Sequence, residues 1–298
     1  MPANRFNGFT DYGVGIGLRI PHYDHILGKK PTVDWFEIIS ENYLDTDGKP
    51  LYYLDRIAER YPMVMHGVSL SIGTTDPIDF DYLRQLKILS HRVDARWISD
   101  HVCWTGLAHQ NSHDLLPVPY NEEMLAHLVE RVRIVQDFLE RPIGMENPSS
   151  YLEFVDSTMT EWEFLHRLCD ETGCMLLLDV NNIYVSCFNH GWDRHAYLDG
   201  VPYDRVVQFH LAGHENEGTH IIDTHDNYVL DEVWTMFKTV HERTGGRATL
   251  VEWDSSIPDF DVVHGEVLKA RDLALASENA ATPAASDRNE GAARVAGA

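Results

Sequence analysis

The sequence has few basic residues for its length. Its 298 residues include 24 Lys and Arg against 47 Asp and Glu, which gives a formal net charge of −23. Proteins bind nucleic acids and anionic membranes mainly through clustered Lys and Arg, so this balance argues against both as partners. The chain also lacks an apolar run of about 18 residues, which a membrane-spanning helix requires. We therefore expect no membrane span and no nucleic-acid partner.

Cysteines and targeting signals are also scarce. The four cysteines have neither the spacing of a disulfide framework nor that of a zinc finger (Cys103, Cys169, Cys174 and Cys187). The first residues, MPANRFNGFTDYG, lack the apolar core of a signal peptide. We expect a cytoplasmic protein with buried, reduced thiols. The Ala-rich stretch 276–298 has no aromatic residue and predicts a disordered tail after a catalytic domain at 1–275.

Short apolar runs alternate with helix-like segments along the chain. Eight runs rich in β-branched or aromatic residues predict strands at 13–20, 34–40, 62–72, 96–104, 142–149, 174–183, 206–213 and 248–254. Apolar residues at helical spacing predict helices at 51–61, 81–93, 121–140, 159–173 and 229–246. Asn121 is a suitable N-cap, and Gly173 and Gly245 are placed as C-caps. The alternation predicts the α/β class and a single (β/α)8 TIM barrel, with a doubly wound open sheet as the alternative.

Polar side chains follow the apolar part of six consecutive predicted strands. They are His66, then Asp100 and His101, Glu146, Asp179 and Asn182, His210 and His214 with Asp223 and His225 in the next loop, and Glu252. In a (β/α)8 barrel these strand ends meet at the face that carries the chemistry. Taken singly, each residue is more often a buried core group, and Asp179 alone could cap a helix.

Taken together, these residues predict a metal site. Carboxylates gathered in a buried place are costly unless cations compensate them. Mixed imidazole and carboxylate donors suit zinc, iron or manganese. Nine of these side chains are candidate ligands, which is more than one ion needs, so we expect two or three ions with Glu146 as the bridge. The nine are His66, His101, Glu146, Asp179, Asn182, His210, Asp223, His225 and Glu252.

Seven motifs along the chain resemble those of one enzyme family. They are GVGIGLRIPHY, ENPSSYLEF, LLLDVNNIYVS, NHGWD, QFHLAGH, IDTH and VEWD. These motifs are similar to those of the multinuclear non-haem iron-dependent oxidative enzymes, the methanobactin-synthase-like family, over about residues 12–272. The resemblance implies a xylose-isomerase-like TIM barrel that holds two to three iron ions, mixed Fe(II) and Fe(III).

The same resemblance implies roles for individual residues. His66, His101 and Glu146 would hold one ion; Glu146, Asp179, His210 and Glu252 a second; and Asn182, Asp223 and His225 a third. His190 would be a further donor or a proton shuttle, and Asp100 and His214 join it as candidate catalytic residues.

The resemblance also implies an activity. Members of the family use O2 to oxidise cysteine in ribosomally made precursor peptides during natural-product maturation. We expect a Cys-containing precursor peptide as substrate and a leader-binding partner protein acting in trans. The long segment 105–120, after the fourth predicted strand, is a candidate substrate loop.

Three other classes of function fit parts of the sequence. The ligand order resembles that of endonuclease IV, but Asn182 stands where that enzyme's third metal has a histidine, and the net charge opposes DNA binding. A sugar isomerase typically needs a lysine near its metals, and no predicted strand end carries one. A non-catalytic scaffold is disfavoured because structural metal sites are usually closed, four-ligand sites.

Overall fold

The strands form a closed barrel in the computed structural model, which describes residues 11–108 and 110–281. The order around the barrel is β1-β12-β9-β8-β7-β4-β3-β2, and every neighbouring pair is parallel. The strands are β1 (Val14–Gly17), β2 (Phe36–Ile39), β3 (Met63–His66), β4 (Ile98–His101), β7 (Gly144–Glu146), β8 (Met175–Asp179), β9 (Val206–Leu211) and β12 (Ala248–Val251). Each lies within one of the eight predicted strand ranges. The barrel prediction is confirmed, and the doubly wound alternative is wrong.

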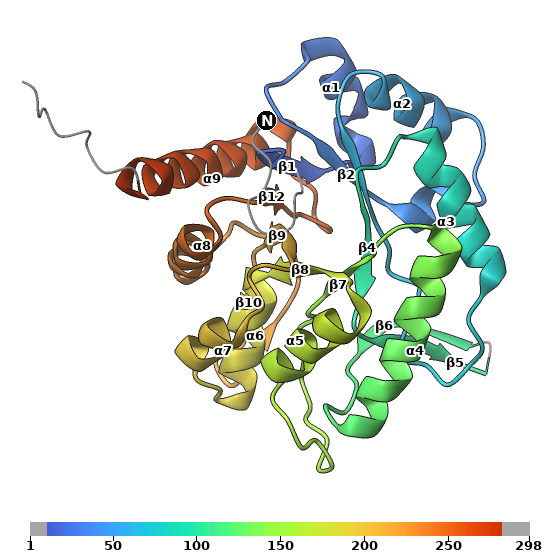
Figure 1. Cartoon of the computed structure of the whole chain (residues 1–298). Helices are drawn as coiled ribbons and strands as arrows, with labels where there is room; N and C mark the ends of the chain where they lie inside the picture. The colour runs from blue at the N-terminus through green and yellow to red at the C-terminus, as the bar shows by residue number, and fades with distance from the viewer. Residues whose placement is uncertain (1–10, 109, 282–298) are drawn as a thin grey trace, which may run out of the picture.

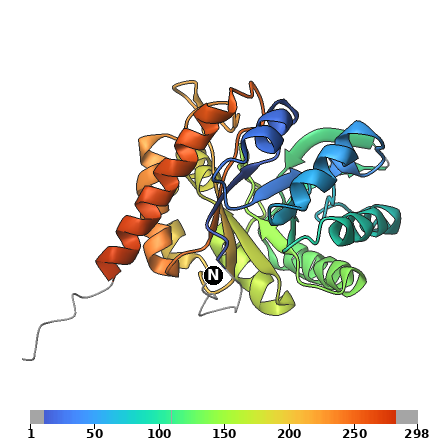
Figure 2. The same cartoon turned by 90° about the horizontal axis from the view of Figure 1, so that it is seen from above.

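Helices surround this barrel (Figures 1 and 2). The five predicted helices are present as α2 (Lys49–Ala58), α3 (Phe80–Arg92), α4 (Glu122–Leu139), α5 (Glu161–Thr172) and α8 (Asp231–Thr244). The side chain of Asn121 accepts from the amide of Met124 at the start of α4, and Gly173 and Gly245 end α5 and α8 in the left-handed conformation. Four α-helices of the structure were not predicted: α1 (Tyr23–Lys29), α6 (Val180–His190), α7 (Arg194–Gly200) and α9 (Phe260–Ala281).

Two predicted boundaries differ from the structure. The range 174–183 is not one strand, because β8 ends at Asp179 and α6 begins at Val180. Helix α9 continues to Ala281, past the expected start of the tail at 276, and the rest of that predicted tail (282–298) lies outside the described residues. In the part of the chain that the structure describes, no helix is both long and apolar enough to cross a membrane.

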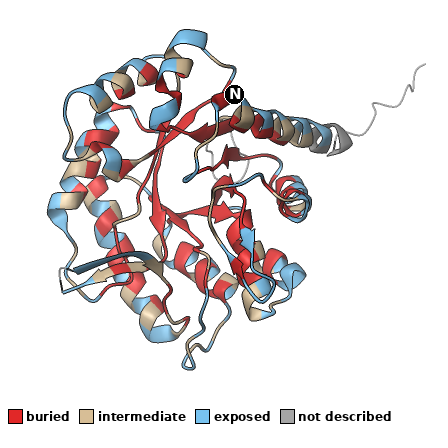
Figure 3. Ribbon diagram, turned by 180° about the vertical axis from the view of Figure 1, so that it is seen from behind, coloured by how far each residue is buried: buried red, intermediate tan, exposed pale blue. Residues whose placement is uncertain are grey.

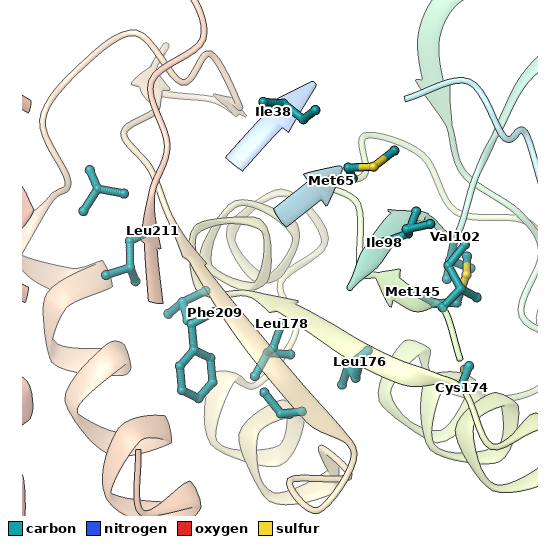
Figure 4. Close-up of a cluster of buried hydrophobic side chains, with 14 of the residues drawn as sticks. Ile38, Met65, Ile98, Val102, Met145, Cys174, Leu176, Leu178, Phe209 and Leu211 are labelled. Carbon is teal, nitrogen blue, oxygen red and sulfur yellow. The ribbon is translucent and has the colours of Figure 1, made fainter. Parts of the chain in front are cut away.

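Alternate residues of each strand face the helices or the barrel interior. Leu176, Leu178, Phe209 and Leu211 belong to the large apolar core between the strands and the helices (Figure 4). Figure 3 shows that the barrel strands are buried. Because side chains alternate along a strand, the residues between them face the opposite way. Polar groups in the barrel strands therefore meet in the interior.

An apolar cluster closes the N-terminal end of the barrel interior. Trp35 and Trp97 directly precede β2 and β4, and they pack with Met175 and Ala248, the first residues of β8 and β12. Trp35 is fully buried and Trp97 nearly so. Water is thus excluded from below, and polar chemistry is confined to the opposite end.

Candidate metal centre

The predicted ligands lie at one end of the barrel because all eight strands are parallel. His66, His101, Glu146 and Asp179 are the last residues of β3, β4, β7 and β8, and Glu252 directly follows β12. Register pairs His101 with Glu146 and Asp179 with His210. All six of these side chains are buried. The local fold therefore brings buried imidazoles and carboxylates together at one end of the barrel.

Glu146 lies between two groups of donors. Its Oε2 is 3.2 Å from His66 Nε2 and 3.4 Å from His101 Nε2. Its Oε1 is 3.5 Å from His210 Nδ1, and one ligand atom each of Glu146, Asp179 and His210 lie within 4.8 Å of one another. Each carboxylate oxygen thus faces a different set of donors, which is the arrangement that a bridging ligand requires.

A second carboxylate, Glu252, connects His210 to the loop that follows β9. Its Oε2 is 3.0 Å from His210 Nδ1 and 3.3 Å from His225 Nδ1. His225 Nε2 is 2.6 Å from Asp223 Oδ1, and one ligand atom each of Asp179, His225 and Glu252 lie within 4.8 Å. The structure thus places Asp223 and His225 beside the barrel ligands, although both come from a loop.

Asp179 combines two tasks. Its Oδ1 accepts from the amide of Asn182 at 2.6 Å and caps α6, while its Oδ2 is buried and has no hydrogen-bond partner in the described part of the chain. The cap also turns Asn182 toward the site, where its Oδ1 has no hydrogen-bond partner among the described residues. A helix cap and a free oxygen acceptor are therefore compatible in one carboxylate.

The pattern of unsatisfied atoms tests whether cations fit here. Among the described residues, the buried side-chain atoms without a hydrogen-bond partner include Glu146 Oε2, Asp179 Oδ2, Asn182 Oδ1, both ring nitrogens of His210 and His225 Nε2. Burial of such groups without partners costs about 1–3 kcal/mol each, and more when they are charged. The atoms of Glu146, His210 and His225 in this set lie 2.6–3.5 Å from neighbouring donors without the alignment of a hydrogen bond, as donors that share an ion would. The donor set fits bound metal.

Electrostatics point the same way. Burial and the neighbouring Glu146 raise the pKa of Asp179 well above its ordinary value. Burial alone would lower the pKa of His210, but Glu252, Glu37 and Glu146 outweigh it and hold that pKa well above its usual range. The carboxylates therefore favour positive charge among the imidazoles, and a bound cation meets the same demand while displacing their protons.

The three candidate catalytic residues lie outside these donor groups. Asp100 accepts from the amides of Leu70 (3.1 Å) and His101 (2.8 Å), so it holds the backbone around β4. His190 Nε2 is 2.8 Å from Ser150 Oγ. His214 Nδ1 is 2.7 Å from Asn181 Oδ1, and its ring stacks on Tyr184.

Two residues at the site were not predicted from the sequence. Glu37, in the middle of β2, is 3.1 Å from His210 Nε2 through its Oε1. Asn181 donates to Asp223 Oδ1 at 2.7 Å while its oxygen faces His214. Glu37 has a detectable signal, because it is the single polar residue of the strand FEII. Glu37 was missed because it does not stand at the end of a strand, where the candidate ligands were sought.

A cavity of about 180 Å3 opens above the donor groups. Its lining includes His66, His101, His225 and Glu252 together with Leu115 and Ser149. Leu115 comes from the antiparallel hairpin of β5 (Trp104–Leu107) and β6 (Gln110–Leu116), which occupies most of the predicted substrate loop. The hairpin therefore forms part of the wall of the site.

Comparison with known proteins agrees with this geometry. The sequence profile of the family described as "RiPP precursor modification enzyme MbnB/TglH/ChrH" matches residues 13–275, RiPP being a ribosomally synthesised and post-translationally modified peptide. A UPF0276 protein of Caulobacter vibrioides is 50% identical over 272 residues, which cover 91% of this chain and 95% of that protein. A UPF0276 protein of Acaryochloris marina is 46% identical over 258 residues, covering 87% and 93%.

Solved structures share the fold at low sequence identity. Endonuclease IV from Thermus thermophilus superposes with a TM-score of 0.57 at 14% identity, over 88% of this chain and 98% of that one. D-psicose 3-epimerase from Clostridium cellulolyticum has a TM-score of 0.57 at 11% identity, over 89% and 99%. These likenesses show a xylose-isomerase-like TIM barrel and no more. The family match over most of the chain decides the assignment: this chain belongs to the MbnB/TglH/ChrH family of RiPP precursor modification enzymes.

Proposed function

We propose that this protein is a multinuclear iron enzyme that uses O2 to oxidise a cysteine of a ribosomally synthesised precursor peptide. The observation that carries the proposal is the donor group of His66, His101 and Glu146, whose ligand atoms lie within 4.8 Å of one another. Two histidines and one carboxylate form the donor set typical of non-haem Fe(II) oxygenases. Membership of a family that modifies RiPP precursors supplies the substrate class.

The residues of this chain divide into three holding groups under this proposal. His66, His101 and Glu146 would hold one ion, and Glu146, Asp179, His210 and Glu252 a second. Asp223, His225 and Asn182 would hold a third, more weakly because an amide donor carries no charge. Bound iron would supply the reduction of O2 and a position for the substrate thiolate.

The protein itself binds and orients the peptide. The cavity of about 180 Å3 beside His101 and His225 has room for one small side chain such as cysteine. Leu115 and Ile39 supply apolar walls there, and the apolar end of the barrel excludes water from below. His190, Asp100 and His214 remain candidates for moving protons between this site and solvent. A separate partner protein would bind the leader of the peptide.

The decisive experiment combines metal content with O2 consumption. Protein purified anaerobically from a culture supplied with iron-57 should contain two to three irons per chain by elemental analysis, with coupled ferrous and ferric signals in Mössbauer spectra. With a precursor peptide encoded beside the gene and its partner protein, O2 consumption should require the cysteine. A Cys→Ser peptide is the matched control. Stoichiometric zinc retained after growth in iron-rich medium would overturn the proposal and favour a hydrolytic barrel.

A further inference from the structure

A buried carboxylate, Glu37, lies beneath the strand-end donors and forms a further possible donor group with His210 and Glu252, whose ligand atoms lie within 4.8 Å of one another. Glu37 is 3% exposed and stands two residues before the end of β2, so it lies deeper in the barrel than the strand-end ligands. Its Oε1 is 3.1 Å from His210 Nε2. This distance allows the ring N–H to donate to Glu37, although the N–H is not in line with the oxygen. Burial of a carboxylate is costly unless a partner compensates it, so the presence of Glu37 in this place requires an explanation.

A hydrogen-bonded chain below Glu37 fixes the direction of its contacts. Trp97 Nε1 donates to Gln208 Oε1 at 2.6 Å, and Gln208 Nε2 donates to Glu37 Oε2 at 2.7 Å. An indole N–H can only donate, so the oxygen of the Gln208 amide must face Trp97 and its NH2 group must face Glu37. Oε2 of Glu37 is thereby engaged, and Oε1 is left for His210.

The two nitrogens of His210 therefore have different surroundings. Nδ1 faces Glu252 Oε2 at 3.0 Å and Glu146 Oε1 at 3.5 Å, on the side where Asp179 also lies. In the described part of the chain, three carboxylates form ion pairs with this ring, and Glu37 is the one that faces Nε2. A cation is attracted to the side with several carboxylates, and the ring proton must then remain on the side of Glu37.

We infer that Glu37 is a positioning residue that keeps the ring proton of His210 on Nε2, so that Nδ1 is the metal-binding atom, and that Trp97 and Gln208 hold Glu37 in place. A carboxylate that accepts from a metal-bound histidine fixes the tautomer and ring orientation, and its loss typically weakens metal binding by about 10–100-fold. The inference rests on the metal-binding part of the proposed function. It does not depend on the identity of the reaction.

The test compares two substitutions of buried glutamates. Glu37→Gln keeps the size of the side chain but presents an NH2 group to either Gln208 or His210, both of which need an acceptor. Glu161→Gln is the matched control, because Glu161 is equally buried and, among the described residues, its hydrogen bonds are with Tyr120 and Tyr197 rather than with a candidate ligand. Anaerobic titration with ferrous iron against a competing chelator should show about 10–100-fold weaker binding of one ion in Glu37→Gln. The control should bind as the wild type does.

Nuclear magnetic resonance of 15N-histidine-labelled protein loaded with zinc provides the second readout. In the wild type, the His210 ring should carry its proton on Nε2 and the metal on Nδ1. Wild-type affinity in Glu37→Gln, or a proton on Nδ1 in the wild type, would overturn the inference. Loss of one whole ion at saturating iron would also overturn it, since Glu37 would then be a direct ligand. If the wild type binds no metal, the proposed function fails first.

A second variant keeps the inference testable if Glu37→Gln does not fold. Gln208→Met leaves Glu37 intact but removes the donor that holds its Oε2. It should weaken binding of the same ion by a smaller factor and shift the His210 ring signals. Unchanged affinity together with unchanged ring signals in Gln208→Met would contradict the inference.

Discussion

Replacement of Glu146 by Gln should remove two ions rather than one. Its Oε2 faces His66 and His101, and its Oε1 faces His210, so the two oxygens serve different donor groups. An amide offers one oxygen and one NH2 group, and the NH2 group cannot bind a cation. Each ion present at 1,000 times its dissociation constant stabilises the fold by about 4 kcal/mol. Two ions therefore contribute about 8 kcal/mol of metal-dependent stability.

The assay is anaerobic thermal unfolding with and without ferrous iron. For a chain of this size, about 1 kcal/mol shifts the Tm by roughly 2–4 °C, so the two ions that share Glu146 should supply about 15–30 °C of the wild-type increase on adding iron. Glu146→Gln should lose most of that increase. Asp223→Asn is the matched control, because Asp223 contacts only the His225 side of the site and its loss should remove at most one ion. The reasoning is refuted if Glu146→Gln keeps the full increase, or loses no more of it than Asp223→Asn.

Two further predictions concern the fold away from the metals. Burial raises the pKa of Glu161 to about 7, although Tyr197 and Tyr120 donate to it. Since an unfolded Glu titrates near 4.5, the contribution of Glu161 to wild-type stability should fall by about 3 kcal/mol as the pH rises from about 4.5 to about 7. Glu161→Gln should lack this slope in urea titrations at several pH values, and an equal slope in both proteins would contradict the assignment. A Cβ added at Gly15 would lie 2.4 Å from the ring of Trp35, so Gly15→Ala should lower the free energy of unfolding by about 1–3 kcal/mol. A Cβ added at Gly28 would have nothing within 4 Å, so Gly28→Ala should leave the Tm unchanged or slightly higher. Equal melting temperatures for these two variants would show that the barrel can absorb the overlap.

The strands were predictable because buried parallel strands are continuous apolar runs. The run LLL before Asp179 and the run VVQFHL of β9 have no solvent-facing side, so their composition alone separates them from the amphipathic helices. The end of β8 was harder to predict. Val180, Ile183 and Val185 continue the apolar composition of β8 into α6, and the helix begins where the amide of Asn182 donates to the capping side chain of Asp179. Such a bond depends on a conformation that sequence composition does not specify.

Part of the donor set was predictable for a different reason. Parallel register makes strand ends neighbours whatever their order in the sequence, so His101 and Glu146 could be expected to meet. Asp223 and His225 could be named as candidates because they follow the seventh predicted strand, but their place beside Glu252 required the path of a loop, and their assignment to a third ion came from the family resemblance. The position of Glu37 required knowing that the interior below the ligands is itself polar. No pattern along β2 states which residues lie opposite it across the barrel.

The polar column inside the barrel is a consequence of the two-residue period of its strands. Gln208 and His210 are two residues apart in β9 and both point inward, where they meet Glu37 from β2 across the barrel. Trp97 is the last member of this polar chain, because an indole has one N–H donor and no acceptor, and here that donor bonds to Gln208. Its ring packs against Trp35 in the apolar cluster at the N-terminal end of the barrel. A ligand at the mouth is thus connected to the most buried part of the fold through direct contacts. Substitutions in this apolar cluster should consequently alter metal affinity at His210 before they alter the donor group of His66 and His101, which does not share this column.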